Sequence, residues 1–326
     1  MPTVLRSFVL LLLVVALPLQ AAEVDVAQEP WQILEKASQA AHRLSYKGIF
    51  VYQAGSTVSS MKITHMNYAN GEYARVISLD GVPREVLRHG NDVVIYNSRN
   101  QKVLIDKRHA PGSFPAVLPG GLTDWLKVSY QASIEGDERV GGRDGQVVLL
   151  EPRDHDRYGY RFSVDREFGL LLKSVMLNEN GDVVEQVAFN QLVLMNEGDI
   201  DWFRPNIDPG KTYEMRPEEI VTPMTVEGEG WTLSQLPTGY RKVEHVRRGI
   251  PGKTVPVDHL VFSDGLASVS LFIEPLGRNA VPKVGQVTQG ATNIYACVED
   301  GNQIIVMGEV PEATVRKIAE AVSFKK

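Results

Sequence analysis

The sequence predicts a mainly β protein, with a large N-terminal antiparallel sheet that carries one helix and a smaller C-terminal α+β domain. The first observation is the period-two alternation of apolar and polar residues, clearest where Tyr160, Phe162 and Val164 alternate with small or polar neighbours. The second is the spacing of turns such as Asn180-Gly181, whose residues tolerate positive φ and favour hairpins. The third is the scarcity of helical periodicity, which only three stretches show.

Length and composition are those of an ordinary globular protein with room for two domains. The chain has 326 residues, of which 43% are hydrophobic and 23% charged, and its formal net charge is −6. A mildly acidic chain argues against a general nucleic-acid binder, which usually carries a basic face. We therefore expect no nucleic-acid partner.

The N-terminal segment predicts export. Arg6 precedes an unbroken apolar run from Phe8 to Leu17, and the small residues Ala21 and Ala22 follow. The run is too short to span a membrane and is typical of a cleaved signal sequence, with an uncleaved anchor as the alternative. We predict a signal peptide at residues 1–22.

The mature chain opens with a helix and continues in short strands. Pro30 suits the first turn of a helix, and apolar residues recur at helical spacing as far as Leu44. Period-two runs separated by close turns such as Asn70-Gly71 then continue to Asp106. This pattern predicts a helix laid against, or into, a many-stranded antiparallel sandwich or barrel.

A proline- and glycine-rich loop interrupts the strands between Lys107 and Gly121. Its apolar residues are Phe114, Val117 and Leu118. Such a loop beside an antiparallel sheet is either a lid over a cavity or a segment packed on the barrel, and the sequence leaves both readings open. These three residues are the candidates for a lid.

The stretch from Asp144 to Leu194 predicts a four-stranded antiparallel meander. Bulky apolar residues lie on one face of its strands, and that face needs a cover. The sequence offers two covers, the helix from Pro30 to Leu44 and the loop from Pro111 to Gly121.

A change in composition divides the mature chain. Residues 199–230 are interrupted by prolines and glycines and show neither helical nor strand periodicity, which indicates an interdomain linker. The predicted domains are therefore 23–198 and 231–326. The second is predicted to be an antiparallel sheet with a covering helix that begins at Pro311. The apolar stripe of this helix comprises Val315, Ile318, Ala319 and Val322.

Residue types that carry catalysis or metal binding are not arranged in the required patterns. Cys297 is the single cysteine, which excludes an intrachain disulfide, and the seven histidines show no metal-ligand spacing. Ser59 to Lys62 fits a Ser-x-x-Lys pattern, but on a predicted strand rather than the helix that this chemistry needs. We predict no catalytic residue, no metal and no cofactor, and binding of a hydrophobic ligand or a protein partner instead of enzyme activity.

Several sequence blocks resemble the MucB/RseB family of periplasmic regulators of extracytoplasmic sigma factors. Those in the N-terminal part include Tyr46-Lys-Gly-Ile-Phe-Val-Tyr52, Leu79-Asp-Gly-Val-Pro-Arg-Glu-Val86 and Tyr158-Gly-Tyr-Arg161. Those in the C-terminal part include Leu236-Pro-Thr-Gly-Tyr240 and Gln289-Gly-Ala-Thr-Asn293. Each block alone is weak, but the resemblance covers nearly all of the mature chain in order.

The resemblance implies both an architecture and a function. The large domain is expected to be an unclosed antiparallel β-barrel like that of the lipoprotein carriers LolA and LolB. The expected function is to bind, in the periplasm, the periplasmic domain of a transmembrane anti-sigma factor of the MucA/RseA type and to protect it from site-1 proteolysis. A lipid, lipopolysaccharide or lipoprotein ligand is expected to release the regulator, and the resemblance allows a homodimer.

Aromatic and methionine side chains are the candidates for these interactions. Candidates for a lipid cavity are Phe50, Tyr52, Met61, Phe162 and Met176. Ordinary core packing would explain each of them equally well. Candidates for contact with the anti-sigma partner are Phe262, Phe272 and Tyr295 in the second sheet.

Two other functions remain open on the sequence alone. A periplasmic carrier of lipids or lipoproteins is favoured by the expected fold of the first domain, although a carrier needs no second domain. A hydrolase that uses Cys297 with a histidine is neither supported nor excluded by the scattered positions of these residues.

Overall fold

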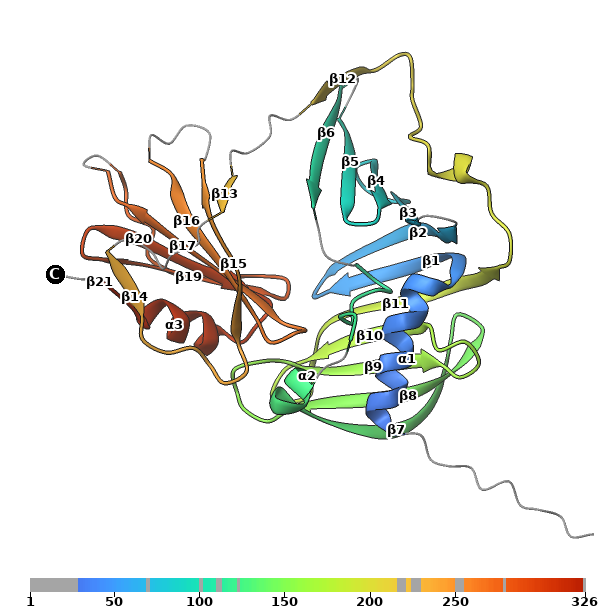
Figure 1. Cartoon of the computed structure of the whole chain (residues 1–326), viewed down its shortest axis with the longest axis horizontal. Helices are drawn as coiled ribbons and strands as arrows, with labels where there is room; N and C mark the ends of the chain where they lie inside the picture. Colours follow the sequence, from blue (N-terminus) through green and yellow to red (C-terminus); the bar gives the residue numbers. More distant parts are fainter. Residues whose placement is uncertain are drawn as a thin grey trace, which may run out of the picture.

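A computed structural model describes residues 29–68, 71–99, 102–109, 113–121, 124–215, 221–223, 230–249, 255–277 and 280–324. The predicted signal peptide, residues 1–22, lies outside these ranges. Two sheets lie side by side, and each is covered on one face by a helix (Figure 1).

Within the described residues, twelve strands form the large sheet in the order β12-β6-β5-β4-β3-β2-β1-β11-β10-β9-β8-β7. Their bounds are β1 (Ser45–Ala54), β2 (Thr57–Tyr68), β3 (Gly71–Ser78), β4 (Arg84–His89), β5 (Asp92–Arg99), β6 (Lys102–His109), β7 (Tyr130–Val140), β8 (Arg143–Pro152), β9 (Gly159–Asp165), β10 (Leu171–Leu177), β11 (Val183–Met195) and β12 (Thr212–Met215). All pairs are antiparallel except β12 with β6. The end strands β7 and β12 do not pair, so the barrel is unclosed, as predicted.

Helix α1 (Pro30–Arg43) lies across the concave face of this sheet (Figure 1). It begins at Pro30, which supplies the φ of a first helical turn, and it ends before Ser45 starts β1. Its apolar stripe, which includes Leu34 and Ala41, is buried against the strands of the predicted meander. Both the helix and the meander were predicted from the sequence, and the structure confirms them.

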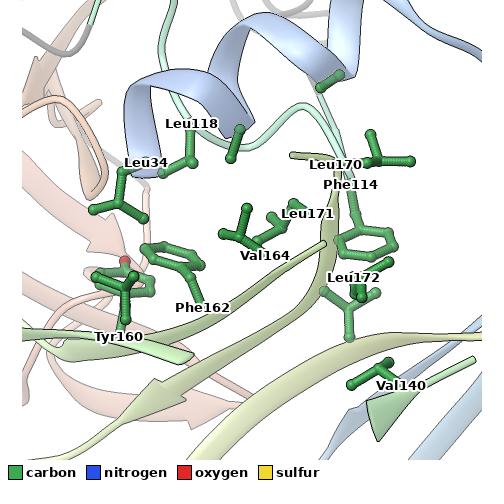
Figure 2. Packing of buried hydrophobic residues seen from close by; sticks show 14 of the residues in the cluster. Leu34, Phe114, Leu118, Val140, Tyr160, Phe162, Val164, Leu170, Leu171 and Leu172 are labelled. Carbon is green, nitrogen blue, oxygen red and sulfur yellow. The ribbon is translucent and has the colours of Figure 1, made fainter. Parts of the chain in front are cut away.

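The large core lies between α1 and strands β8, β9 and β10 (Figure 2). Phe162 and Leu171 are 1% and 0% exposed, and the rings of Tyr160 and Phe162 stack with their centroids 5.5 Å apart. Burial of each such side chain contributes about 1.5–3 kcal/mol to folding. The apolar residues whose alternation predicts these strands therefore form the face of the sheet that α1 covers.

The second sheet has seven strands in the order β13-β15-β16-β17-β20-β19-β18 within the described residues. Their bounds are β13 (Val221–Pro223), β15 (Arg241–Arg248), β16 (Val257–Ser263), β17 (Ser268–Pro275), β18 (Gly285–Gln289), β19 (Thr292–Glu299) and β20 (Asn302–Gly308). Helix α3 (Glu312–Glu320) covers one face, and β14 (Trp231–Leu233) pairs with β21 (Val322–Phe324) beside it. We call the opposite face, which carries Phe272, the open face.

The structure corrects the sequence analysis at short elements. The apolar spacing places Val322 in the final helix, but α3 ends at Glu320 and Val322 begins β21. The predicted linker, residues 199–230, contains the 3-10 helix η1 (Ile200–Phe203) and supplies β12 and β13 to the two sheets. Strands of three or four residues leave too few positions for an alternation to be recognised.

Candidate functional site

A cleft of about 470 Å³ lies where the concave face of the large sheet meets the second sheet. One wall comes from β9, β10 and β11, and the other from β17, β19 and β20. The residues that line it are Val117, Tyr160, Phe162, Ser174, Met176, Glu185, Val187, Leu266, Ser268, Ser270, Thr292, Met307, Gly308 and Glu309. We call it the inter-sheet cleft. Because both sheets supply walls, a ligand bound there would contact both parts of the chain.

Two carboxyl groups face this cleft from opposite parts of the chain. Glu185 projects from β11 and accepts a hydrogen bond from the hydroxyl of Tyr52 over 2.7 Å. Glu309 follows β20 and lines the opposite wall, where its side chain is partly desolvated but still reaches solvent. Burial raises the pKa of Glu185, and the hydrogen bond from Tyr52 opposes that rise. The pKa of Glu309 is raised as well, first by desolvation between the walls and then by the charge of Glu185.

A buried ion pair joins the two parts of the chain. Nη1 of Arg157 donates to Oδ2 of Asp264 over 2.5 Å, and both side chains are 0% exposed. The hydroxyl of Tyr130 donates to the same carboxylate over 3.2 Å, and Arg157 also donates to the carbonyl of Thr238. Burial lowers the pKa of Arg157, but the hydrogen bond to Asp154 and the charge of Asp264 outweigh it, so that the pKa is raised.

Helix α2 (Asp124–Ser129) completes this junction. Nε1 of Trp125 donates to the carbonyl of Gly239 over 2.6 Å, and the guanidinium of Arg241 lies 4.9 Å from the centre of the Trp125 ring. Gly239 has a φ of +83°, and a Cβ there would lie 2.2 Å from Oγ of Ser129. The close approach at this point therefore requires glycine.

The concave face of the large sheet is occupied near its middle. The ring of Phe114 lies 5.3 Å from that of Phe50 and 5.0 Å from that of Phe189, measured between centroids. Phe114 and Leu118 are buried, and Oγ of Ser38 in α1 donates to the carbonyl of Pro119 over 2.7 Å. Figure 2 shows Phe114 and Leu118 at the core beneath α1. A cavity of only about 40 Å³ remains beside this loop.

The structure brings some of the predicted cavity and lid residues together. Phe162, Met176 and Val117 line the inter-sheet cleft, and Tyr52 reaches Glu185 at its wall. Phe50 packs instead with Phe114 in the interior of the large sheet, and Leu118 is part of the same core. Met61 is half-buried on β2 against that core.

The three predicted partner residues lie on different faces of the second sheet. Phe262 is 1% exposed in the core under α3. Tyr295 lies on the same face, with the guanidinium of Arg316 5.6 Å from its ring. Only Phe272 lies on the open face, where it stacks on His259 at 4.2 Å. A single surface patch formed by all three is therefore not present.

Sequence reasoning missed the charged residues of this region. From the sequence, the segment from Arg153 to Arg157 is most simply a solvated hairpin tip, with a partner-binding patch as the alternative, but Arg157 is fully buried against Asp264. Nothing in the local sequence marks it, because the residues that bury it come from the second sheet about a hundred positions later. Glu185 likewise reads as a polar residue of an alternating strand. Its position in a cleft depends on the neighbouring sheet.

Other chemistry receives little support in the described part of the chain. No group of three His, Cys, Asp or Glu side chains there could hold a metal ion. Burial raises the pKa of the Cys297 thiol, which disfavours the thiolate that a nucleophile needs. No helix in the described ranges is long and apolar enough to cross a membrane.

Comparison with known proteins gives consistent similarities over most of the chain. The family model of the MucB/RseB N-terminal domain matches residues 29–207, and that of the MucB/RseB C-terminal domain matches residues 225–323. The sigma factor AlgU regulatory protein MucB of Pseudomonas aeruginosa is 31% identical over 323 residues, covering 97% of this chain and 96% of that protein. The sigma-E factor regulatory protein RseB of Haemophilus influenzae is 28% identical, covering 90% and 91%.

A solved complex is similar in structure as well. The structure of the Pseudomonas aeruginosa MucA/MucB complex gives a TM-score of 0.73 at 27% identity, covering 92% of this chain and all of that chain. A crystal structure of MucB with the periplasmic part of MucA gives 0.70 at 28% identity, covering 91% and 100%.

Proposed function

Because the chain belongs to the MucB/RseB family, we propose that it is a periplasmic regulator that binds the periplasmic domain of a MucA/RseA-type anti-sigma factor and protects it from site-1 proteolysis. Its relatives are named as regulatory proteins of sigma factors. The MucB of Pseudomonas aeruginosa has been solved in complex with MucA. These relatives support a binding protein over an enzyme.

The inter-sheet cleft is the observation that carries this proposal. It is concave, apolar over much of its surface, and bordered by hydroxyl groups that can bond a peptide backbone. A protease needs an extended segment that is free on both sides. A segment seated between two sheets is not accessible in that way, so that occupancy of the cleft would by itself slow cleavage.

Release by a lipid ligand forms the second part of the proposal. The interior of the large sheet is filled by α1 and by Phe114, which leaves about 40 Å³ free beside the loop. An acyl chain would have to displace the Phe114 ring to enter. Lipid and anti-sigma segment are then linked ligands, and a coupling of about 1–3 kcal/mol changes the occupancy of one by the other several-fold or more.

A protection assay tests the first part. The mature chain is mixed with the periplasmic domain of the MucA-type anti-sigma factor from the same organism, and the rate of cleavage by the site-1 protease is measured. We expect the chain to slow cleavage. Ser268→Trp, which fills the cleft, should restore the cleavage rate seen without the chain. Thr57→Trp, at an exposed position on β2, should slow cleavage as the wild-type chain does. Cleavage at the same rate with and without the chain would contradict the proposal.

Added lipid tests the second part and separates the regulator from a carrier. Lipopolysaccharide or phospholipid micelles added to the complex should speed cleavage. If the chain neither binds nor protects the anti-sigma domain, but transfers a lipidated protein between membranes, the carrier function replaces the regulator.

A further inference from the structure

The inter-sheet cleft carries negative charge that the protein itself does not neutralise. Its lining includes Glu185 and Glu309 but no lysine, arginine or histidine. Within the described ranges, neither carboxylate forms an ion pair, and the phenol of Tyr52 is the only hydrogen-bond donor to Glu185. Carboxylates held near one another without a cation cost free energy, and such arrangements cluster at functional sites.

The rest of the lining suits the stem of a long basic side chain. Val117, Leu266 and Met307 are half-buried and offer apolar surface from both parts of the chain. The hydroxyl-bearing residues are Ser174, Ser268, Ser270 and Thr292. Lysine and arginine side chains place their methylene groups on apolar surface while the charged end reaches polar partners. An apolar cleft with carboxylates from opposite walls has the complementary arrangement.

We propose that the inter-sheet cleft selects the anti-sigma segment through one lysine or arginine side chain, whose cation lies between Glu185 and Glu309. This inference rests on the function proposed above and adds the chemistry of recognition. It makes both glutamates specificity-determining residues. The proposal also assigns the anti-sigma segment and the lipid to different sites. Both carboxylates would repel a phosphorylated lipid headgroup, so the lipid must act elsewhere.

The raised pKa values of both carboxyl groups agree with this geometry and give a readout. A bound cation favours the ionised carboxylates and lowers their pKa values, so binding should release protons near the raised pKa of each group. The titratable groups facing them are Tyr52 on β1, Tyr160 on β9 and the two glutamates themselves. Affinity should therefore fall as the pH drops, and it should fall less in variants that lack the carboxylates.

Calorimetric titration with the periplasmic domain of the MucA-type anti-sigma factor from the same organism tests the proposal. Glu185→Gln and Glu309→Gln should each weaken binding roughly tenfold and reduce the protons released. Glutamine keeps the volume of glutamate and can still accept from Tyr52, and unchanged thermal midpoints would verify folding. Glu35→Gln removes the same charge from the exposed side of α1 and should leave affinity within about twofold.

The partner side of the contact can be identified in the same assay. Each lysine and arginine of the anti-sigma domain is replaced by glutamine in turn. One of these replacements should weaken binding to the wild-type chain about tenfold. The same replacement should weaken binding to the Glu309→Gln variant little further, because the two residues would form a directly coupled pair.

Each result bears on a different statement. If the wild-type chain binds, and Glu185→Gln and Glu309→Gln both change its affinity for the anti-sigma domain by less than about twofold, the cation site is overturned. The regulator function would still stand. Failure of the wild-type chain to bind would overturn both. Tighter binding of the glutamine variants to anionic phospholipid vesicles, with no change for the anti-sigma domain, would make the cleft a headgroup site and also overturn the proposal.

Discussion

Replacement of Arg157 by methionine tests how much the buried ion pair at the junction between the two sheets contributes to stability. Asp264 would keep hydrogen bonds from Tyr130 and from the backbone amides of Leu266 and Ala267, but its charge would be buried without a counter-charge. Breaking one side of a buried pair costs about 3–5 kcal/mol. Because three donors to Asp264 remain, we expect the lower end, about 3 kcal/mol.

The assay is equilibrium unfolding in urea, followed by tryptophan fluorescence. Trp125 lies at the junction and Trp231 in the second domain, so loss of coupling should also split the transition. Arg166→Met is the matched control. Arg166 pairs with Asp137 at the surface, where both side chains are about half exposed, and the expected cost is about 0–1 kcal/mol. Equal costs for the two arginine variants would refute the reasoning.

Three further changes probe the core, the helix anchor and the junction. Leu34→Ala should lower the free energy of unfolding by about 2–5 kcal/mol, because this side chain is 0% exposed under α1. Gly239→Ala should cost about 1–3 kcal/mol through its positive φ alone, read from thermal midpoints, with more from the clash at Ser129. Burial raises the pKa of Glu72, but hydrogen bonds from two histidines lower it to about 2, and the bond to Glu72 raises the pKa of His42. The wild-type chain should therefore exceed Glu72→Gln in free energy of unfolding most between about pH 4.5 and 6.5. This difference should decline as the pH falls toward 2 and as the pH rises through the raised pKa of His42. An advantage that is flat with pH would contradict this.

The sequence contains most of the information about the sheets because their signals are local. Gly181 adopts the positive φ that the predicted turn at Asn180-Gly181 needs, and Pro30 sets the start of α1. The parallel pairing of β12 with β6 has no such signal, since the two strands are joined through a chain of about a hundred residues. Val322 continues the apolar spacing of α3, and only its pairing with Leu233 turns it into a strand.

The candidate site could be predicted only in part for a related reason. Apolar residues such as Phe162 and Met176 were identified because strand alternation marks the concave face. Glu185 sits on that same face among apolar neighbours, and this position was the one local signal that could have identified it. Glu309 could not have been paired with it, because their proximity arises from the packing of two sheets that no sequence period describes.

The apolar interior and the inter-sheet cleft are connected by one loop. Phe114 packs between Phe50 and Phe189, while Val117, three residues later, lines the cleft. Three residues span at most about 11 Å, so a ligand that displaces Phe114 by moving the loop would also shift the backbone that carries Val117. A lipid in the interior would then change the shape of the cleft without separating the sheets, and the buried pair of Arg157 with its partner carboxylate need not break. The coupling that the proposed release requires is small enough for two arrangements of this loop to supply it.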